Sequence, residues 1–376
     1  MNRLSSMLRK TVSISLFVGL TTLIAEPYIA VRTGFKCSQC HVNRTGGGKR
    51  TDFGNVYSQY KLLMHSAQSI TGPYSFDPKL NKSVSIGANF RIEQSYLEKY
   101  VTRPANVGDP IKTVPEYWSA GAFKEKNLYV DMDLIQDRFK LYLDQDMTSG
   151  TARELWSMIS LPGNTYLKFG KMLLPYGYRL MDDEAFVRNT TGYTYNSTDL
   201  AYEFGIEPGP LSLVSNITQT QWVSVGSLVF KDIPVIRTVR VGGSYSRELK
   251  KWPTDKKGSY GVFAGTTLGM FTFLGERDYT KVRGVNKEDE INKIEDYFEV
   301  DFLPMQGLNF KATYESLWPD KKIAQAKNNQ TRLTLGVEPF VVQYLQVGLY
   351  YRKNDWIPQS TSFNQDQIVG RLHVFF

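Results

Sequence analysis

The chain has 376 residues, with 45 Lys and Arg against 37 Asp and Glu and a formal net charge of +8. No basic run alternates with aromatic residues, so the composition gives no support to nucleic-acid binding. The 23 Tyr, 21 Phe and 30 Gly favour twisted strands and aromatic rings at a membrane interface over a helical bundle, in a chain long enough for one large barrel.

Residues 1–25 are predicted to be a signal peptide. Basic residues precede an apolar stretch at residues 12–24, and Ala25 is a suitable last residue before cleavage. The apolar stretch is short for a membrane span; an uncleaved anchor helix is the alternative. No later segment reads as a transmembrane helix, so the rest of the chain is expected either to be soluble or to cross a membrane as strands.

The only two cysteines, Cys37 and Cys40, form a complete C-x-x-C-H motif with His41. Two thiols at this spacing can add to the two vinyl groups of one haem, and the next histidine can supply the proximal iron ligand. A redox-active dithiol needs no histidine there and is expected within a βαβ pattern, which the sequence lacks. The motif therefore predicts one covalent haem c. A disulfide or a metal site is the alternative.

Residues 26–82 are predicted to form a small cytochrome c-like cap that precedes the barrel. The three glycines at 46–48 either allow a tight turn beside a flat macrocycle or form a flexible linker. The distal iron ligand has three candidates, although a lone histidine is more often structural. His65 is the first choice, Met64 is a high-potential alternative, and His373 is the third.

From residue 83 to residue 376 the sequence alternates between apolar and polar side chains. Such a period of two predicts strands with one apolar and one polar face. The pattern is clear at residues 84–93 and recurs at residues 128–134 and 139–144. The apolar face points inward in a soluble sandwich but toward lipid in an outer-membrane barrel, so alternation alone fits both.

Loop lengths favour the all-β outer-membrane barrel. Short turns such as 162–163 generally alternate with longer polar loops such as 175–199, as in barrels with tight periplasmic turns. The first connection, 98–126, is predicted to be a long loop, and the loop at 175–199 either folds inward to narrow the lumen or stays exposed. We predict about 16 antiparallel strands, beginning near Val84, Asn127, Arg138, Arg153, Asn164, Leu200, Leu211, Gln221, Ile236, Ser259, Gly269, Asn292, Leu308, Gln330, Tyr344 and Gln367.

The last strand gives the most specific barrel signal. Apolar residues share one face over 368–376, and the terminal Phe376 is typical of bacterial outer-membrane proteins. Because Phe376 is expected to face lipid, His373 should face the lumen near the periplasmic end, where the cap enters. His373 is therefore either a candidate iron ligand or an ordinary histidine of the pore lining.

In layout, the whole chain resembles the fused monohaem c-type cytochrome–porins of iron-oxidising and related metal-cycling bacteria. The resemblance is specific at residues 30–41 and in the C-terminal strand. It implies a haem plug in an outer-membrane barrel, periplasmic cytochromes or other electron carriers as partners, and iron(II) oxidation as the best-known activity. The glycine-rich run at residues 42–50 departs from the iron-oxidising members, so the electron donor and the direction of flow stay open.

Three functions compete on this sequence. The first is electron transfer through one haem, which has to lie inside the barrel or work with a soluble cytochrome because the apolar band is about 25 Å tall. The second is a passive porin for small solutes with a haem-bearing plug. The third is a barrel scaffold around a separate cytochrome. The sequence shows no Ser/His/Asp or paired-carboxylate arrangement that would indicate hydrolysis.

Overall fold

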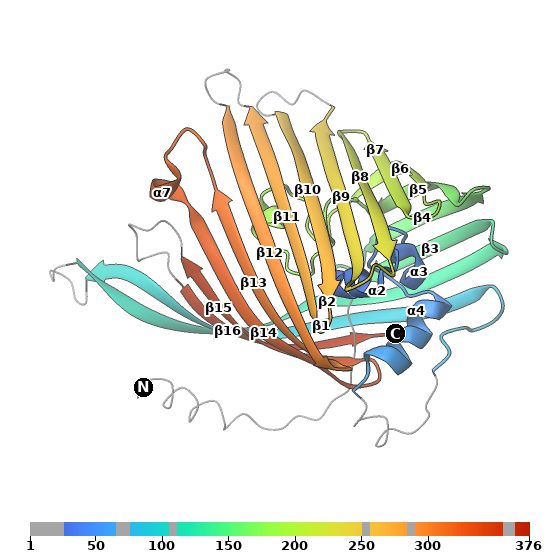
Figure 1. Cartoon of the computed structure of the whole chain (residues 1–376), viewed down its shortest axis with the longest axis horizontal. Coiled ribbons are helices and arrows are strands. Elements are labelled where there is room, and N and C mark those ends of the chain that lie inside the picture. Colours follow the sequence, from blue (N-terminus) through green and yellow to red (C-terminus); the bar gives the residue numbers. More distant parts are fainter. Residues whose placement is uncertain (1–25, 65–75, 105–110, 250–255, 284–289, 356–364) are drawn as a thin grey trace.

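The computed structural model describes residues 26–64, 76–104, 111–249, 256–283, 290–355 and 365–376. Sixteen antiparallel strands form a closed barrel in which neighbours in sequence pair and β1 pairs with β16 (Figure 1). The predicted fold class is therefore confirmed. The strands are β1 (Val84–Pro104), β2 (Ile111–Ile135), β3 (Phe139–Asp146), β4 (Ala152–Leu161), β5 (Thr165–Leu173), β6 (Thr198–Ile206), β7 (Leu211–Thr218), β8 (Gln221–Lys231), β9 (Ile236–Glu248), β10 (Lys256–Leu268), β11 (Phe271–Arg283), β12 (Ile291–Met305), β13 (Leu308–Trp318), β14 (Gln330–Val342), β15 (Leu345–Asp355) and β16 (Gln365–Phe375).

The two faces of the strands have opposite polarity. On β4 and β5, Leu155 and Leu167 are 57% and 49% exposed on the outside, whereas Glu154 and Lys168 are buried on the inside. Apolar side chains outside and charged side chains inside are the inverse of a soluble sandwich and the arrangement of a membrane barrel. The side-chain phase of the last strand is also confirmed, because His373 is buried inside and Leu372 is exposed outside.

The prediction of a long loop between the first two strands is wrong for most of residues 98–126, because these residues continue the two strands. β2 begins at Ile111 rather than near Asn127, and β1 and β2 pair along their whole length to Pro104 opposite Ile111. The hairpin extends beyond the neighbouring strands (Figure 1). Residues 117–124 are exposed on both faces, so no apolar–polar alternation marked them as a strand.

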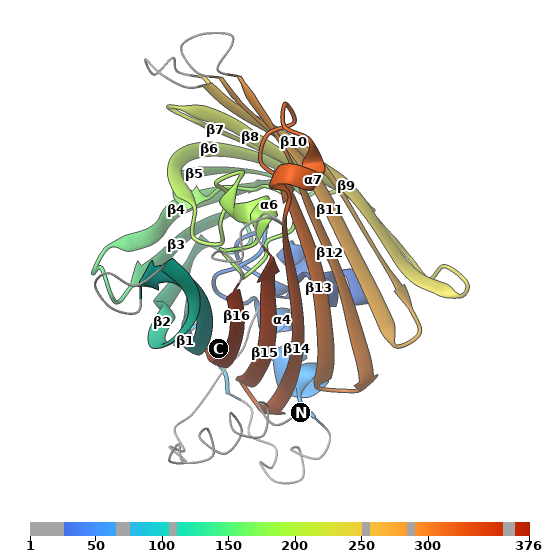
Figure 2. The same ribbon diagram turned by 90° about the vertical axis from the view of Figure 1, so that its left-hand side faces the viewer.

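Helices α2 (Pro27–Thr33) and α3 (Cys37–Cys40) of the predicted cap lie inside the barrel, and α4 (Asp52–Tyr57) lies at the end of the barrel where the C-terminus lies (Figure 1 and Figure 2). Among the described residues, no helix is long and apolar enough to cross a membrane. The predicted cap also contains the π-helical η1 (Ser58–Leu62); two further short helices, α6 (Phe186–Asn189) and α7 (Gln325–Asn328), lie in loops between strands.

Helix α2 holds the cap against the inner wall. Pro27 occupies its first turn, where the missing N–H costs nothing, and Gly34 ends it in the left-handed conformation. Val31 is buried, and its carbonyl oxygen accepts a hydrogen bond of 2.5 Å from the Thr238 hydroxyl of β9. Helix α2 also contacts β10 and β11, so it packs against three neighbouring strands of the wall.

Candidate functional site

Helix α3 brings the motif residues together. Cys37 and Cys40 are one turn apart and therefore lie on the same side of the helix, and both are free. The Gln39 side chain accepts a 2.9 Å hydrogen bond from the Lys36 backbone N–H at the start of the helix. At its end, the His41 N–H donates to the Cys37 carbonyl oxygen at 2.9 Å. The C-x-x-C spacing is thus realised as a single helical turn that leads directly into the histidine.

A tight hairpin follows the motif and contains the three glycines; whether a macrocycle lies beside it stays a prediction. His41 pairs with Arg50, and the glycines between them have φ of +92°, +79° and +66°. These left-handed angles form a turn rather than a flexible linker. A Cβ atom on Gly48 would lie 2.5 Å from the Tyr142 hydroxyl, so this turn packs closely against the inner wall.

We expect Gly48→Ala to destabilise the protein more than Gly163→Ala. Both positions have positive φ, +66° and +75°, but a Cβ on Gly163 meets nothing within 4 Å. Both variants carry the backbone penalty of about 1–2 kcal/mol, and only Gly48→Ala adds a clash. Urea unfolding in detergent measures both, and equal losses would contradict the close packing of the hairpin.

Cys37, Cys40 and His41 line one cavity in the lumen. Its walls come from the cap, from residues 175–179 of the loop after β5, and from strands β7 to β10. Most of the lining is apolar, with a few placed polar groups, which is typical of a cofactor site.

The chemistry of the motif side chains fits haem binding. Burial, followed by the charge of Arg50, lowers the pKa of His41 to about 3, which leaves a neutral imidazole, the form that binds a metal. Its Nδ1 atom is buried without a hydrogen-bond partner among the described residues. Burial raises the pKa of Cys40 to about 11, so this thiol is protonated and uncharged. A largely apolar cavity with two free thiols and a neutral histidine therefore suits a covalently attached metal macrocycle.

Two of the three candidates for the distal ligand, Met64 and His373, lie outside this cavity. Met64 does not line this cavity; its backbone N–H donates to the Phe340 carbonyl oxygen at 3.1 Å, beside the turns at the barrel end. His373 lines a smaller cavity together with His41, and its Nε2 contacts the Asn89 side chain. His65 lies outside the described residues. The distal ligand stays a prediction.

The loop between β5 and β6 folds into the lumen, as the sequence predicted for one of its two alternatives. Residues 174–197 lie across the barrel interior, farther than the cap from the barrel end where the C-terminus lies (Figure 2). Arg188 of this loop is buried and forms an ion pair with Glu276 of β11. The Phe186 N–H donates to Glu315 of β13 at 2.8 Å. These contacts fix the loop to the wall on the far side of the lumen.

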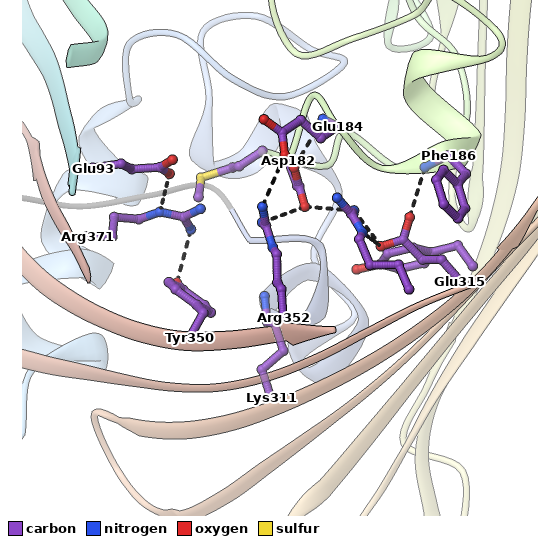
Figure 3. A network of polar contacts seen from close by, with 12 residues as sticks. Glu93, Asp182, Glu184, Phe186, Lys311, Glu315, Tyr350, Arg352 and Arg371 are labelled. Carbon is purple, nitrogen blue, oxygen red and sulfur yellow. Dashed lines mark hydrogen bonds and ion pairs between the residues drawn. The ribbon is translucent and has the colours of Figure 1, made fainter. Parts of the chain in front are cut away.

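Asp182 fastens the tip of this loop to two arginines of the wall (Figure 3). Its Oδ2 accepts from Arg332 of β14 at 2.8 Å and from Arg352 of β15 at 2.7 Å. Burial alone would raise the pKa of Asp182, but Arg332 and Arg352 outweigh it and hold this pKa well below its usual range.

We expect this fastening to be insensitive to pH across the neutral range. A carboxyl with a lowered folded-state pKa contributes stability above its unfolded value of about 3.9 and loses it only as the pH falls through the folded value. Hydrogen exchange of amides 174–197, corrected for the pH dependence of intrinsic exchange, should show the same protection between about pH 5 and 8. Protection of these amides that falls with pH within this window would contradict the assignment.

Two arginines of the cavity were not recognised as site residues from the sequence. Arg179 and Arg240 both line it, one on the inward-folded loop and the other on β9. Each lies more than a hundred residues from the motif, so only the closed barrel brings them there. The alternation could have placed Arg240 on the inner face, but no local signal connected it with Cys37.

Several solved structures have a similar fold. No family model matches the chain, and no curated protein matches it. OmpT of Vibrio cholerae, an outer-membrane protein, is 12% identical with a TM-score of 0.55, over 80% of this chain and 100% of that one. The outer-membrane channel DcaP of Acinetobacter baumannii is 11% identical with a TM-score of 0.56, over 80% of this chain and 100% of that one. OmpF of Salmonella typhi, in complex with daunomycin, is 10% identical with a TM-score of 0.54, over 79% of this chain and 99% of that one. At these identities the likeness shows the fold alone: the chain is a closed 16-stranded barrel of the outer-membrane porin type.

Proposed function

We propose that this protein is an outer-membrane barrel that carries one haem c in its lumen and exchanges electrons with carriers in the periplasm. Cys37 and Cys40 would hold the haem, and His41 would ligate its iron. The observation that carries the proposal is the convergence of all three residues on one largely apolar cavity inside the barrel. The porin-type fold supports the barrel and its place in the outer membrane; the haem depends on the motif and the cavity.

The attachment chemistry requires only the two thiols and a haem with its vinyl groups. In each addition a sulfur–carbon bond forms, the S–H bond breaks, and the hydrogen passes to the other vinyl carbon, so no oxidant is consumed. When bound, the haem supplies a one-electron redox centre in an apolar environment. The role of the chain is to hold that centre in the lumen and to exclude water from it.

The periplasmic mouth offers a surface for a partner. Phe53 and Val56 of α4 and Tyr60 of η1 are 46%, 54% and 45% exposed there. Phe53 packs against Phe35, which lines the cavity, with ring centroids 5.2 Å apart. Exposed apolar side chains so close to the cavity fit a small, transient contact with a soluble electron carrier.

A channel for small solutes is the second candidate, and the likeness to the outer-membrane channel DcaP favours it. In this function the lumen would conduct solutes, and the cap would act as a plug. The loop fastened through Asp182 and the cap both lie across that path (Figures 2 and 3). The scaffold function has less support, because the lumen already holds the cap of the same chain.

Proteoliposomes distinguish electron transfer from solute passage. Vesicles containing the protein would trap a redox dye and, separately, a small uncharged solute, and a reductant would be added outside. Electron transfer predicts reduction of the dye without loss of the solute, and loss of that reduction in a Cys37→Ser/Cys40→Ser variant. Equal dye reduction in both proteins, together with leakage of the solute, would support the channel instead.

A further inference from the structure

The cavity contains two arginines that lack a carboxylate partner. No ion pair joins Arg179 or Arg240 to a carboxylate among the residues that the structure describes. Other arginines that face the lumen do form such pairs: Arg44, Arg91, Arg153, Arg188, Arg332, Arg352 and Arg371. A desolvated guanidinium without an anion is unfavourable, so this exception indicates an anionic group that belongs in the cavity.

Arg179 is held rigidly by the loop itself. Its two terminal nitrogens donate to the carbonyl oxygens of Tyr195 at 3.2 Å and Leu174 at 3.1 Å, at opposite ends of the loop. Its Nε is buried without a partner among the described residues. The side chain also lies against the glycine turn, because a Cβ on Gly47 would be 3.2 Å from its Cδ. The Arg179 side chain therefore lies between the loop and the glycine turn, and its guanidinium is bound to the loop.

Arg240 is held in the same way from the wall. One terminal nitrogen donates to the Phe35 carbonyl oxygen at 2.6 Å, two residues before Cys37, and the other contacts the Ser227 hydroxyl at 3.5 Å. Its Nε is likewise buried and without a partner in the described part of the chain. Both arginines are thus fixed by neutral oxygens, and neither forms a direct ion pair with a carboxylate among the described residues.

We propose that Arg179 and Arg240 bind the two propionate carboxylates of the haem. The inference rests on the proposed function, because it needs the haem. Thioether formation consumes the vinyl groups and leaves the propionates as the anionic groups of the macrocycle, and two fixed guanidiniums match two carboxylates. In this arrangement the loop that narrows the lumen is also part of the cofactor site and closes over the haem.

Arg179→Gln and Arg240→Gln should each lower the reduction potential of the haem, because removal of a buried positive charge disfavours the reduced form. The expected effect is about a tenfold fall in the ratio of reduced to oxidised haem at a fixed potential, which is about 59 mV for one electron. Arg179→Lys and Arg240→Lys keep the charge and should restore most of the potential.

Lys231→Gln is the matched control. It also removes one positive charge beside the cavity, since the Lys231 ammonium lies 5.0 Å from the Phe35 ring centroid, but its side chain is exposed and screened by solvent. The potential is measured by spectroelectrochemical titration, and resonance Raman of the propionate bending mode reports the loss of hydrogen bonding directly.

The propionate assignment would be overturned if both Gln variants had the same reduction potential and the same propionate Raman modes as Lys231→Gln. That result would leave the haem proposal intact. A wild-type protein without covalent haem would overturn the proposed function, and the assignment with it. Heat-modifiable migration on gels identifies a variant that fails to fold. In that case the test uses the corresponding Lys variant, and its resonance Raman propionate mode is compared with that of the wild type.

Discussion

Replacement of both Cys37 and Cys40 by serine is expected to give a folded barrel without covalent haem. The barrel should assemble because its 16 strands pair independently of the motif. The cap should stay in the lumen because α2 is bound to the wall through Thr238, and Lys311 lies 2.7 Å from Glu26. Intact mass, the visible spectrum and heat-modifiable gel migration measure haem and folding separately.

The single variants sharpen this prediction. Cys37→Ser and Cys40→Ser should each retain one haem through the remaining thioether, and the pyridine haemochrome spectrum should shift because one vinyl group is left unreacted. A matched serine substitution at Thr45, in the same hairpin, should leave haem content and spectrum unchanged. Haem that survives in the double variant as a covalent adduct would contradict attachment through this motif.

Asp182→Ala is expected to release the loop between β5 and β6 from the wall. The substitution removes the oxygen that Arg332 and Arg352 share, while Arg332 keeps its pair with Glu315 at 2.5 Å. Because the Asp182 side chain is 26% exposed, we expect a loss of about 1–3 kcal/mol, which shifts the ratio of closed to open loop by about 5- to 150-fold. Hydrogen exchange of amides 174–197 measures this shift.

Glu184→Gln is the control for the same loop. Glu184 pairs with Arg352 at 3.3 Å but is 61% exposed, so solvent screens the pair and its loss should cost at most about 1 kcal/mol. Exchange in this variant should stay within about fivefold of the wild type. Equal exchange in Asp182→Ala and Glu184→Gln would show that Asp182 does not fasten the loop.

The barrel was predictable from the sequence because its signal is spread over the chain and repeats at every strand. Most predicted strand starts fall within a few residues of the observed ones, as at Val84, Leu211, Gln221, Ile236, Leu308 and Gln330. The prediction failed at the β1–β2 hairpin for a physical reason. Outside the apolar band both faces of a strand meet water, so backbone pairing continues without the alternation that reveals it.

The candidate site was predictable only where its residues are adjacent in sequence. Cys37, Cys40 and His41 form a local motif whose spacing already implies its chemistry. Arg179 and Arg240 reach the same cavity from a loop and a distant strand, and this convergence depends on barrel closure and on the inward course of the loop. An arginine at an isolated position in the sequence does not indicate which distant residues it contacts, so the cavity could not be predicted from the sequence.

Covalent attachment of one haem is tested most directly by the intact mass of the purified wild-type chain, produced in a host that exports proteins and attaches haem c. The expected result is the mass of the polypeptide plus one haem, with the pyridine haemochrome spectrum of a haem bound through two thioethers. A polypeptide without haem, lighter by two hydrogens because Cys37 and Cys40 have formed a disulfide, would contradict it.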